Sequence, residues 1–165
     1  MKFRTLLLAT VCIAALSFSA EASGQIYSFR HFNSTNGLPG NYINTIGQDS
    51  NGVIWLGLES GLYRHDGFDF FHVQPPDTLA TGYPCTTFCD DKGTMWIGYS
   101  DGSLYSYSPG NKLRRRPISA DKISGIISDP QGRVCALSQS GGIFRFDSKN
   151  DGIFKAYSLP KKISA

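Results

Sequence analysis

The stretch DSNGVIWLGLESGLYRHDG, residues 49–67, places three glycine-containing turn signals around two short apolar runs. Its first half returns twice further along the chain, as CDDKGTMWIG at residues 89–98 and as SDPQGRVCAL at residues 128–137. In each copy an aspartate lies three residues before a glycine, and these glycines are 41 and 39 residues apart. Internal repetition at such a period indicates a fold built from copies of one small unit. The residues of this frame are Asp49, Gly52, Trp55, Gly57, Asp90, Gly93, Trp96, Gly98, Asp129 and Gly132.

Each copy is predicted to contain four short strands. In the first copy we expect strands at residues 43–48, 53–57, 62–65 and 68–73, with glycine-containing turns between them. Four antiparallel strands repeated about every 40 residues are typical of β-propeller blades. Helical repeats of similar length are excluded, because glycine or proline interrupts every window long enough for a helix. The predicted fold is therefore all-β, a partial β-propeller with about three four-stranded blades of a seven-bladed ring.

The predicted blades cover residues 38–73, 83–118 and 123–158. Residues 25–32 are predicted to form a lone strand that would close a ring against its last blade, and residues 159–165 resemble the start of a further blade. Three blades that turn by about 50° each, as in a seven-bladed ring, would leave the ring open. Strand edges and apolar faces would then be exposed. We therefore expect a truncated or split part of a larger protein, rather than a complete small protein.

The frame residues are expected to be structural. The glycines can take the positive φ of a tight hairpin, and the aspartates can accept hydrogen bonds from N–H groups of the turn. Trp55 and Trp96 are expected to fill the wedge between neighbouring blades, because an indole ring buries a large apolar surface. Cys135 occupies the equivalent position in the third copy, so we expect a weaker contact there. The aspartate spacing fits neither an EF-hand calcium loop nor the sialidase Asp box.

The first 22 residues are predicted to be a secretory signal peptide. Two basic residues precede an apolar run at 6–18, and Ala20 and Ala22 give the small-x-small spacing of a cleavage site after Ala22. The alternative is a retained transmembrane anchor, but the run is shorter than the roughly 20 apolar residues that span a bilayer. The mature chain, residues 23–165, is therefore expected to be exported and to contain no membrane span.

The composition and spacing exclude several function classes. Charged residues make up 18% of the chain and the formal net charge is +3, so we expect no nucleic-acid partner. Cys85, Cys89 and Cys135 are expected to be small apolar fillers, because an odd number of cysteines in an exported chain argues against a disulfide framework. No residues have the spacing of a metal site or of a Ser-His-Asp triad, so we expect no metal, no cofactor and no catalytic residue. The basic run at 114–116 is expected to be a solvated strand edge, with binding of an anionic partner as the alternative.

Residues 72–87 form the longest predicted connection between blades, and a ligand could bind there. Tyr83 and Pro84 of this connection could stack on a sugar ring. The alternative is that both side chains simply pack against the protein.

The segment NGLPGNYINTIGQDSNGVIWLGLESGLYRHDGFDFF, residues 36–71, resembles the two-component regulator propeller repeats. Their pattern combines GLP-x-N, D-x-x-G-x-[ILM]-W-[IL]-G-T and G-L-x-R-[YF]-D-G. The second copy keeps DDKGTMWIG, whereas the third keeps DPQG and GGIFRFD but lacks the Trp. The small Thr of the family pattern is Leu58, Tyr99 and Ser138 here, so its role does not transfer.

This resemblance implies a periplasmic, non-enzymatic sensor module of a hybrid two-component histidine kinase, recognising a ligand derived from carbohydrate. Its partners would be the missing propeller blades or the sensor kinase, because no kinase or regulator part for phosphorelay signal transduction is recognisable in the sequence. Two alternatives remain open. One is an enzymatic propeller similar to the streptogramin lyases, and the other is a structural or adhesive propeller completed by oligomerisation.

Overall fold

The computed structural model describes residues 29–76, 81–108, 110, 113–116, 118, 121–147 and 153–158. The chain divides into two compact units, Met1–His31 and Phe32–Ala165. The predicted signal peptide, its cleavage after Ala22 and the predicted start of a further blade at residues 159–165 lie outside the described residues. Of the strand predicted at residues 25–32, the described part, residues 29–32, is not in a strand. A 3-10 turn capped by the Asn33 side chain follows at once and turns the backbone there.

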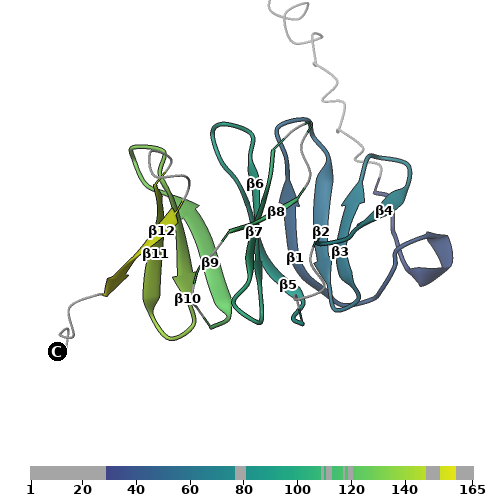
Figure 1. The fold of residues 1–165 in the computed structure, drawn as a ribbon. Helices are drawn as coiled ribbons and strands as arrows, with labels where there is room; N and C mark the ends of the chain where they lie inside the picture. The colour runs from purple at the N-terminus through teal and green to yellow at the C-terminus, as the bar shows by residue number, and fades with distance from the viewer. Residues whose placement is uncertain are drawn as a thin grey trace, which may run out of the picture. The chain divides into compact units, whose positions relative to one another are not determined.

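The all-β prediction is confirmed, since the described residues form twelve strands and one short 3-10 helix, η1 (Ser34–Asn36). The strands make three antiparallel sheets of four, each in chain order. Figure 1 shows the second sheet between the first and the third. The first sheet contains β1 (Ile43–Gln48), β2 (Ile54–Leu58), β3 (Gly61–His65) and β4 (Phe70–Val73). The second contains β5 (Pro84–Cys89), β6 (Met95–Tyr99), β7 (Leu104–Tyr107) and β8 (Arg114–Arg116). The third contains β9 (Ile123–Ser128), β10 (Val134–Ser138), β11 (Gly142–Asp147) and β12 (Ile153–Ser158).

The turn between the first two strands of each sheet follows from the repeated Asp-x-x-Gly. Gly52 has a φ of +82° and its N–H donates to the carbonyl of Asp49 at 3.0 Å, which closes the turn. The N–H of Asp49 in turn donates to the carbonyl of Val53 at 3.0 Å. Gly93 and Gly132 have φ values of +75° and +72° and close their own turns in the same way. A residue with a Cβ is strained at this φ, so glycine is required.

In the first sheet, β1 has the predicted bounds, and the bounds of the other three strands differ from the prediction by one or two residues. The largest difference is at β4, which begins at Phe70 and not at residue 68. The carboxylate of Asp66 accepts hydrogen bonds from the N–H groups of Phe68 and Asp69, at 2.9 and 3.0 Å. These bonds hold residues 67–69 in a turn, and pairing with β3 starts only after it.

Each pair of neighbouring sheets shares one apolar core. The cluster between the first and second sheets consists of Trp55, Leu62, Met95, Ile97, Tyr99, Tyr105 and Leu113. The cluster between the second and third consists of Trp96, Leu104, Ile123, Ile126, Val134, Ala136 and Phe144. Trp55 and Trp96 are 0% and 2% exposed, so each indole lies fully inside the contact between its own sheet and the next. The hydrophobic effect therefore holds sheet against sheet through these clusters.

Two residues after Trp55 and after Trp96 stands a glycine that allows neighbouring sheets to approach closely. A Cβ added at Gly57 would lie 2.8 Å from the Cβ of Pro84, and one added at Gly98 would lie 2.5 Å from the Cγ2 of Ile123. Pro84 and Ile123 each begin the first strand of the following sheet. In the third sheet the equivalent residue is Leu137, which is half-buried. A following strand could not approach that face as closely as in the first two contacts.

Apolar side chains are exposed on the two outer sheets. Ile46 of β1 is 65% exposed and Ile127 of β9 is 51% exposed. Part of the first sheet is covered by the segment before β1, where Leu38 is buried and the Phe32 ring meets Phe70 edge-on at 5.4 Å. Within the described residues, no helix has the length and apolar character needed to cross a bilayer.

Candidate functional site

The repeated aspartate connects the turn to the core. In the first copy, one carboxylate oxygen of Asp49 accepts from the N–H groups of Asn51 and Val53 at 2.9 and 3.1 Å. The other oxygen accepts from the indole Nε1–H of Trp55 at 3.0 Å. In the second copy, the equivalent donors to Asp90 are Lys92 N, Thr94 N and Trp96 Nε1, at 3.0, 2.8 and 2.9 Å. The carboxylate thus orients the indole that fills the contact between sheets, a role that the turn pattern alone did not indicate.

In the third copy an arginine, in place of the Trp indole, donates the side-chain hydrogen bond to the aspartate. Cys135 stands at the Trp position, and the Nε–H of Arg133 donates to the outer carboxylate oxygen of Asp129 at 2.5 Å. The other oxygen accepts from the N–H groups of Gln131 and Arg133 at 3.0 and 2.9 Å. Burial acts to raise the pKa of Asp129, but the hydrogen bonds from Arg133 and Gln131 outweigh it and lower the pKa below 3.8.

A guanidinium lies against the indole of the first copy. The Cζ of Arg64, on β3, is 5.1 Å from the centre of the Trp55 ring and 5.3 Å from the centre of the Tyr107 ring. Tyr107 belongs to the second sheet and its ring centre is 5.0 Å from that of Trp55, so this cation lies beside two touching aromatic rings of adjacent sheets. Its Nη1 is 3.5 Å from the hydroxyl of Tyr107, a weak hydrogen bond.

In the second copy a guanidinium also lies against the indole, but the arginine that supplies it comes from another strand. We call each arrangement of guanidinium and two rings a stack. Ser106 pairs with Trp96 as Arg64 pairs with Trp55, so the second copy has no arginine at this position. Arg116 of β8 supplies the cation instead, with its Cζ 5.7 Å from the Trp96 ring centre and 5.2 Å from the Phe146 ring centre. Its Nε–H donates to the Ser106 hydroxyl at 2.8 Å. Burial, and then the charge of Arg114, lower the pKa of Arg116.

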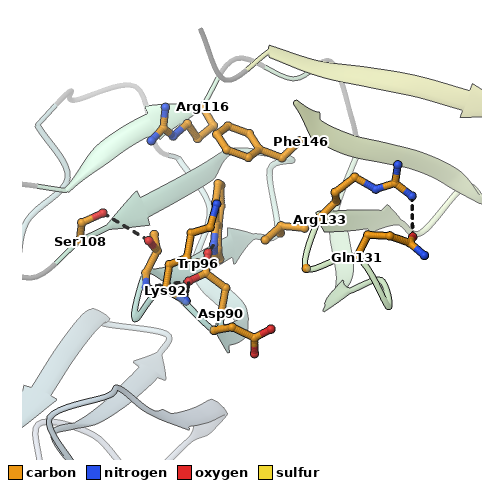
Figure 2. A pocket seen from close by; sticks show the side chains of 12 residues that line it. Asp90, Lys92, Trp96, Ser108, Arg116, Gln131, Arg133 and Phe146 are labelled. Carbon is orange, nitrogen blue, oxygen red and sulfur yellow. Dashed lines mark hydrogen bonds between the residues drawn. The ribbon is translucent and has the colours of Figure 1, made fainter. Parts of the chain in front are cut away.

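Each stack borders a cleft between sheets. The second cleft, between the second and third sheets, has a volume of about 270 Å³. Figure 2 shows Trp96, Arg116 and Phe146 close together, with Gln131 and Arg133 on the other side, where the Nη2–H of Arg133 donates to the Gln131 amide oxygen at 2.9 Å. Its lining residues are Asp90, Asp91, Lys92, Thr94, Trp96, Ser108, Arg116, Gln131, Gly132, Arg133, Val134 and Phe146. The cleft thus combines aromatic rings with charges of both signs and an amide.

The first cleft, between the first and second sheets, is larger, at about 710 Å³. Its lining residues are Arg64, Phe71, His72, Val73, Gln74, Pro76, Tyr107 and Leu113. Phe71 lies directly opposite Arg64 in the register of β3 and β4 and is 51% exposed. The first cleft therefore has one cation and an accessible aromatic ring, and none of its described lining residues is acidic.

The predicted ligand loop is partly incorporated into the second sheet. Pro84 is the first residue of β5 and is fully buried, so the prediction that it lies in a loop and can stack on a sugar is wrong. It packs beside Gly57, which its rigid ring can approach because the glycine has no side chain. Tyr83 precedes the strand and is half-buried, with its N–H donating to the Ser100 hydroxyl at 3.0 Å. Of the two residues, only Tyr83 remains a candidate for ligand contact.

An aspartate ties this connection to the turn between β6 and β7. One carboxylate oxygen of Asp101 accepts from the N–H groups of Thr81 and Gly82 at 2.9 and 3.2 Å. Burial acts to raise its pKa, but these bonds and one from Ser103 outweigh burial, and the pKa lies below 3.8. The carboxylate is therefore a structural anchor for the connection.

Three of the four cysteines, Cys85, Cys89 and Cys135, lie in the described residues, where they are half-buried and form no disulfide. Burial raises the pKa of each thiol, which makes the reactive thiolate scarce at neutral pH. The Cys85 thiol donates to the carbonyl of Ile123 in the third sheet at 3.0 Å, so it links two sheets. Over the described residues, no group of three or more histidine, cysteine, aspartate or glutamate side chains could hold a metal ion.

The resemblance seen in the sequence is confirmed over one segment: the family model described as Two component regulator propeller matches residues 37–60. No curated protein matches the sequence. Among solved structures, a catalytically inactive H270A virginiamycin B lyase from Staphylococcus aureus with quinupristin matches with a TM-score of 0.60 and 16% identity over 73% of this chain and 42% of its own. A putative gluconolactonase matches with a TM-score of 0.56 and 11% identity over 69% of this chain and 48% of its own.

The extracellular domain of a putative hybrid two-component system from B. thetaiotaomicron matches with a TM-score of 0.43 and 19% identity over 78% of this chain and 23% of its own. At that score, the match supports no argument about this chain. The lyase and gluconolactonase likenesses, at 16% and 11% identity, show a shared propeller fold only. The chain spans less than half the length of these solved structures.

Proposed function

We propose that this chain is a ligand-recognising propeller module of a two-component signalling protein, located in the periplasm and without catalytic activity of its own. The observation that carries the proposal is the match of residues 37–60 to the two-component regulator propeller family. The clefts between sheets are consistent with recognition, since ligands bind in concave sites with aromatic walls and a few convergent polar groups. Signalling would require a kinase as partner, and further blades would complete the ring.

The second cleft suits a ligand derived from carbohydrate. Its volume of about 270 Å³ is close to the lower end of known ligand pockets, which begin at roughly 300 Å³. The half-buried Phe146 offers apolar surface to the C–H face of a sugar, while Lys92 and Gln131 offer hydrogen bonds to hydroxyl groups. A monosaccharide or disaccharide would therefore fit this cleft better than a long chain.

A titration followed by ¹H–¹⁵N NMR tests this proposal on the full chain. A panel of neutral monosaccharides and disaccharides is added, and the indole N–H signals of Trp55 and Trp96 are recorded. Binding in the second cleft should shift the Trp96 signal, and Gln131→Ala should weaken that response because it removes a lining amide and no core contact. Lack of any shift at Trp96 across the panel would contradict ligand binding at this cleft.

An enzymatic propeller is the second candidate, and the fold shared with virginiamycin B lyase favours it. Incubating the chain with quinupristin and following its concentration by chromatography separates the two functions. A sensor module leaves quinupristin unchanged, whereas consumption that scales with protein concentration would replace the sensor proposal by an enzymatic one. Light scattering on the same sample tests the third possibility, a structural propeller completed by oligomerisation, which requires a closed oligomer.

A further inference from the structure

Arg64 lines the first cleft and Arg116 lines the second, so their surroundings can be compared directly. Both guanidinium groups lie beside a contact between the Trp of one sheet and an aromatic ring of the next. The Nε–H of Arg116 donates to the hydroxyl of Ser106 at 2.8 Å, whereas the Nε of Arg64 is buried and has no hydrogen-bond partner. The difference arises because Arg64 itself occupies the position that Ser106 holds in the second copy. Among the described residues, the first cleft therefore supplies the cation without an acceptor for its Nε.

Within the part of the chain that the structure describes, the charge of Arg64 also has no carboxylate partner, and the Tyr107 hydroxyl at 3.5 Å is its one weak hydrogen bond. Buried N–H donors are almost always satisfied, and leaving one without an acceptor is destabilising. The adjacent rings of Trp55 and Tyr107 offset part of this cost through cation–π attraction, but apart from the weak bond to the Tyr107 hydroxyl they accept no hydrogen bond from the guanidinium.

The surroundings indicate what kind of acceptor fits. A guanidinium presents its in-plane N–H groups as a fork that matches two oxygens of a carboxylate or sulfate. The first cleft has a volume of about 710 Å³, enough for a ring that carries such a group. Phe71, which pairs with Arg64 and is 51% exposed, can pack against the ring, and Gln74 at the end of β4 can bind its hydroxyl groups.

We propose that the first cleft binds an anionic saccharide, with Arg64 as the ligand of its carboxylate or sulfate group. This inference rests on the proposed function, which it deepens by naming the charge of the ligand and the residue that recognises it. The second cleft lacks an equivalent site because Asp90 and Asp91 line it beside Arg116, and because Ser106 accepts from the Nε of Arg116.

The test uses the isotopically labelled full chain and three sugars with the same ring: D-glucuronate, D-glucose 6-sulfate and D-glucose. The readouts are the Nε–H signal of Arg64 and the indole signal of Trp55, with the Trp96 indole as internal reference. At least one acidic sugar should shift the Arg64 and Trp55 signals and bind at least tenfold more tightly than glucose. The acidic sugar that binds more tightly identifies whether the carboxylate or the sulfate is the group recognised.

Two variants test the role of the guanidinium. Arg64→Gln removes the charge and should abolish the shift of Trp55, whereas Arg64→Lys keeps the charge without the fork and should retain weaker binding. If Arg64→Gln fails to fold, the wild-type titration and the lysine variant show whether the Arg64 guanidinium binds the acidic group. Equal responses to glucuronate, glucose 6-sulfate and glucose, or an Arg64 signal that none of them moves, would overturn the inference.

The same titrations distinguish this inference from the proposed function. If the acidic sugars leave the Arg64 signal unmoved while a neutral saccharide still shifts the Trp96 indole, the anion site is refuted and the sensor proposal stands. If no neutral saccharide affects Trp96 while glucuronate shifts Arg64, ligand binding at the second cleft is refuted and the anion site stands.

Discussion

Replacing Gly98 by alanine tests whether this glycine, two residues after Trp96, sets the distance between the second and third sheets. The added Cβ would lie 2.5 and 2.7 Å from the Cγ2 and Cβ of Ile123, and 2.7 Å from the Cγ2 of Thr86. Ile123 and Thr86 are β-branched and both lie in strands, so neither can move away without shifting its backbone. Inserting a methyl group into such a contact costs about 1–3 kcal/mol. Gly98→Ala should therefore lower the free energy of unfolding by about 2 kcal/mol.

Gly125→Ala is the matched control. Gly125 also lies in a strand, its φ is not positive, and an added Cβ would meet only the end of the Leu137 side chain, at 3.4 Å. A Gly→Ala change at such a site stabilises a protein by about 0.4–1 kcal/mol, because it restricts the unfolded chain. The two variants should thus change stability in opposite directions.

Urea unfolding of the full chain, followed by tryptophan fluorescence, measures both effects. With a slope near 2 kcal/mol/M, typical of small proteins, Gly98→Ala should lower the urea midpoint by about 1 M without changing the slope. Gly125→Ala should leave the midpoint unchanged or raise it. If Gly98→Ala unfolds within about 0.3 M of the wild type, or if both variants lose stability equally, close approach at Gly98 does not limit the packing of the sheets.

Three further outcomes follow from the structure. Trp96→Phe removes the indole N–H that Asp90 accepts at 2.9 Å and should lower the free energy of unfolding by about 1–3 kcal/mol in the same urea assay; an unchanged midpoint would contradict a structural role for this bond. Asp101 has a pKa below 3.8 in the folded chain, so its contribution to stability is present above that pH and is lost as the pH falls through the folded pKa. Asp101→Asn should accordingly flatten the pH dependence of the urea midpoint between about pH 4 and pH 2, and identical profiles would refute the anchoring role. Burial raises the pKa of the Cys85 thiol above 9.0, so iodoacetamide at pH 8 should modify it slowly in the native chain and much faster in urea; equal rates would show that the thiol is accessible.

The repeat predicted the fold because its signals act within a few residues. An aspartate and a glycine three positions apart close a turn through bonds to neighbouring backbone groups, and the same bonds form in all three copies. Alternating apolar residues between such turns are enough to predict a four-stranded sheet. Where the boundaries differed, as at β4, a side chain within the same turn was responsible: Asp66 held the backbone out of the strand.

The contacts between sheets were beyond this reasoning, because they join residues about 40 positions apart whose distance depends on strand register and sheet twist. Sequence reasoning placed Pro84 in a loop, whereas it begins β5 and packs beside Gly57 of the preceding sheet. It also treated the basic run at 114–116 as a solvated edge, yet Arg116 turns inward to Ser106 and to the Trp96 ring.

The sequence by itself thus determined the turns, the strands and the number of sheets, all of which depend on hydrogen bonds between near neighbours in the chain. Only the tertiary structure decided which charges lie between the sheets and which of them lack a partner. The Nε of Arg64 and the Nε of Arg116 differ only in whether a hydroxyl from another strand lies within reach. That difference is set by strand register within each sheet, because Ser106 of β7 faces Arg116 of β8, whereas Arg64 itself holds the equivalent position of β3.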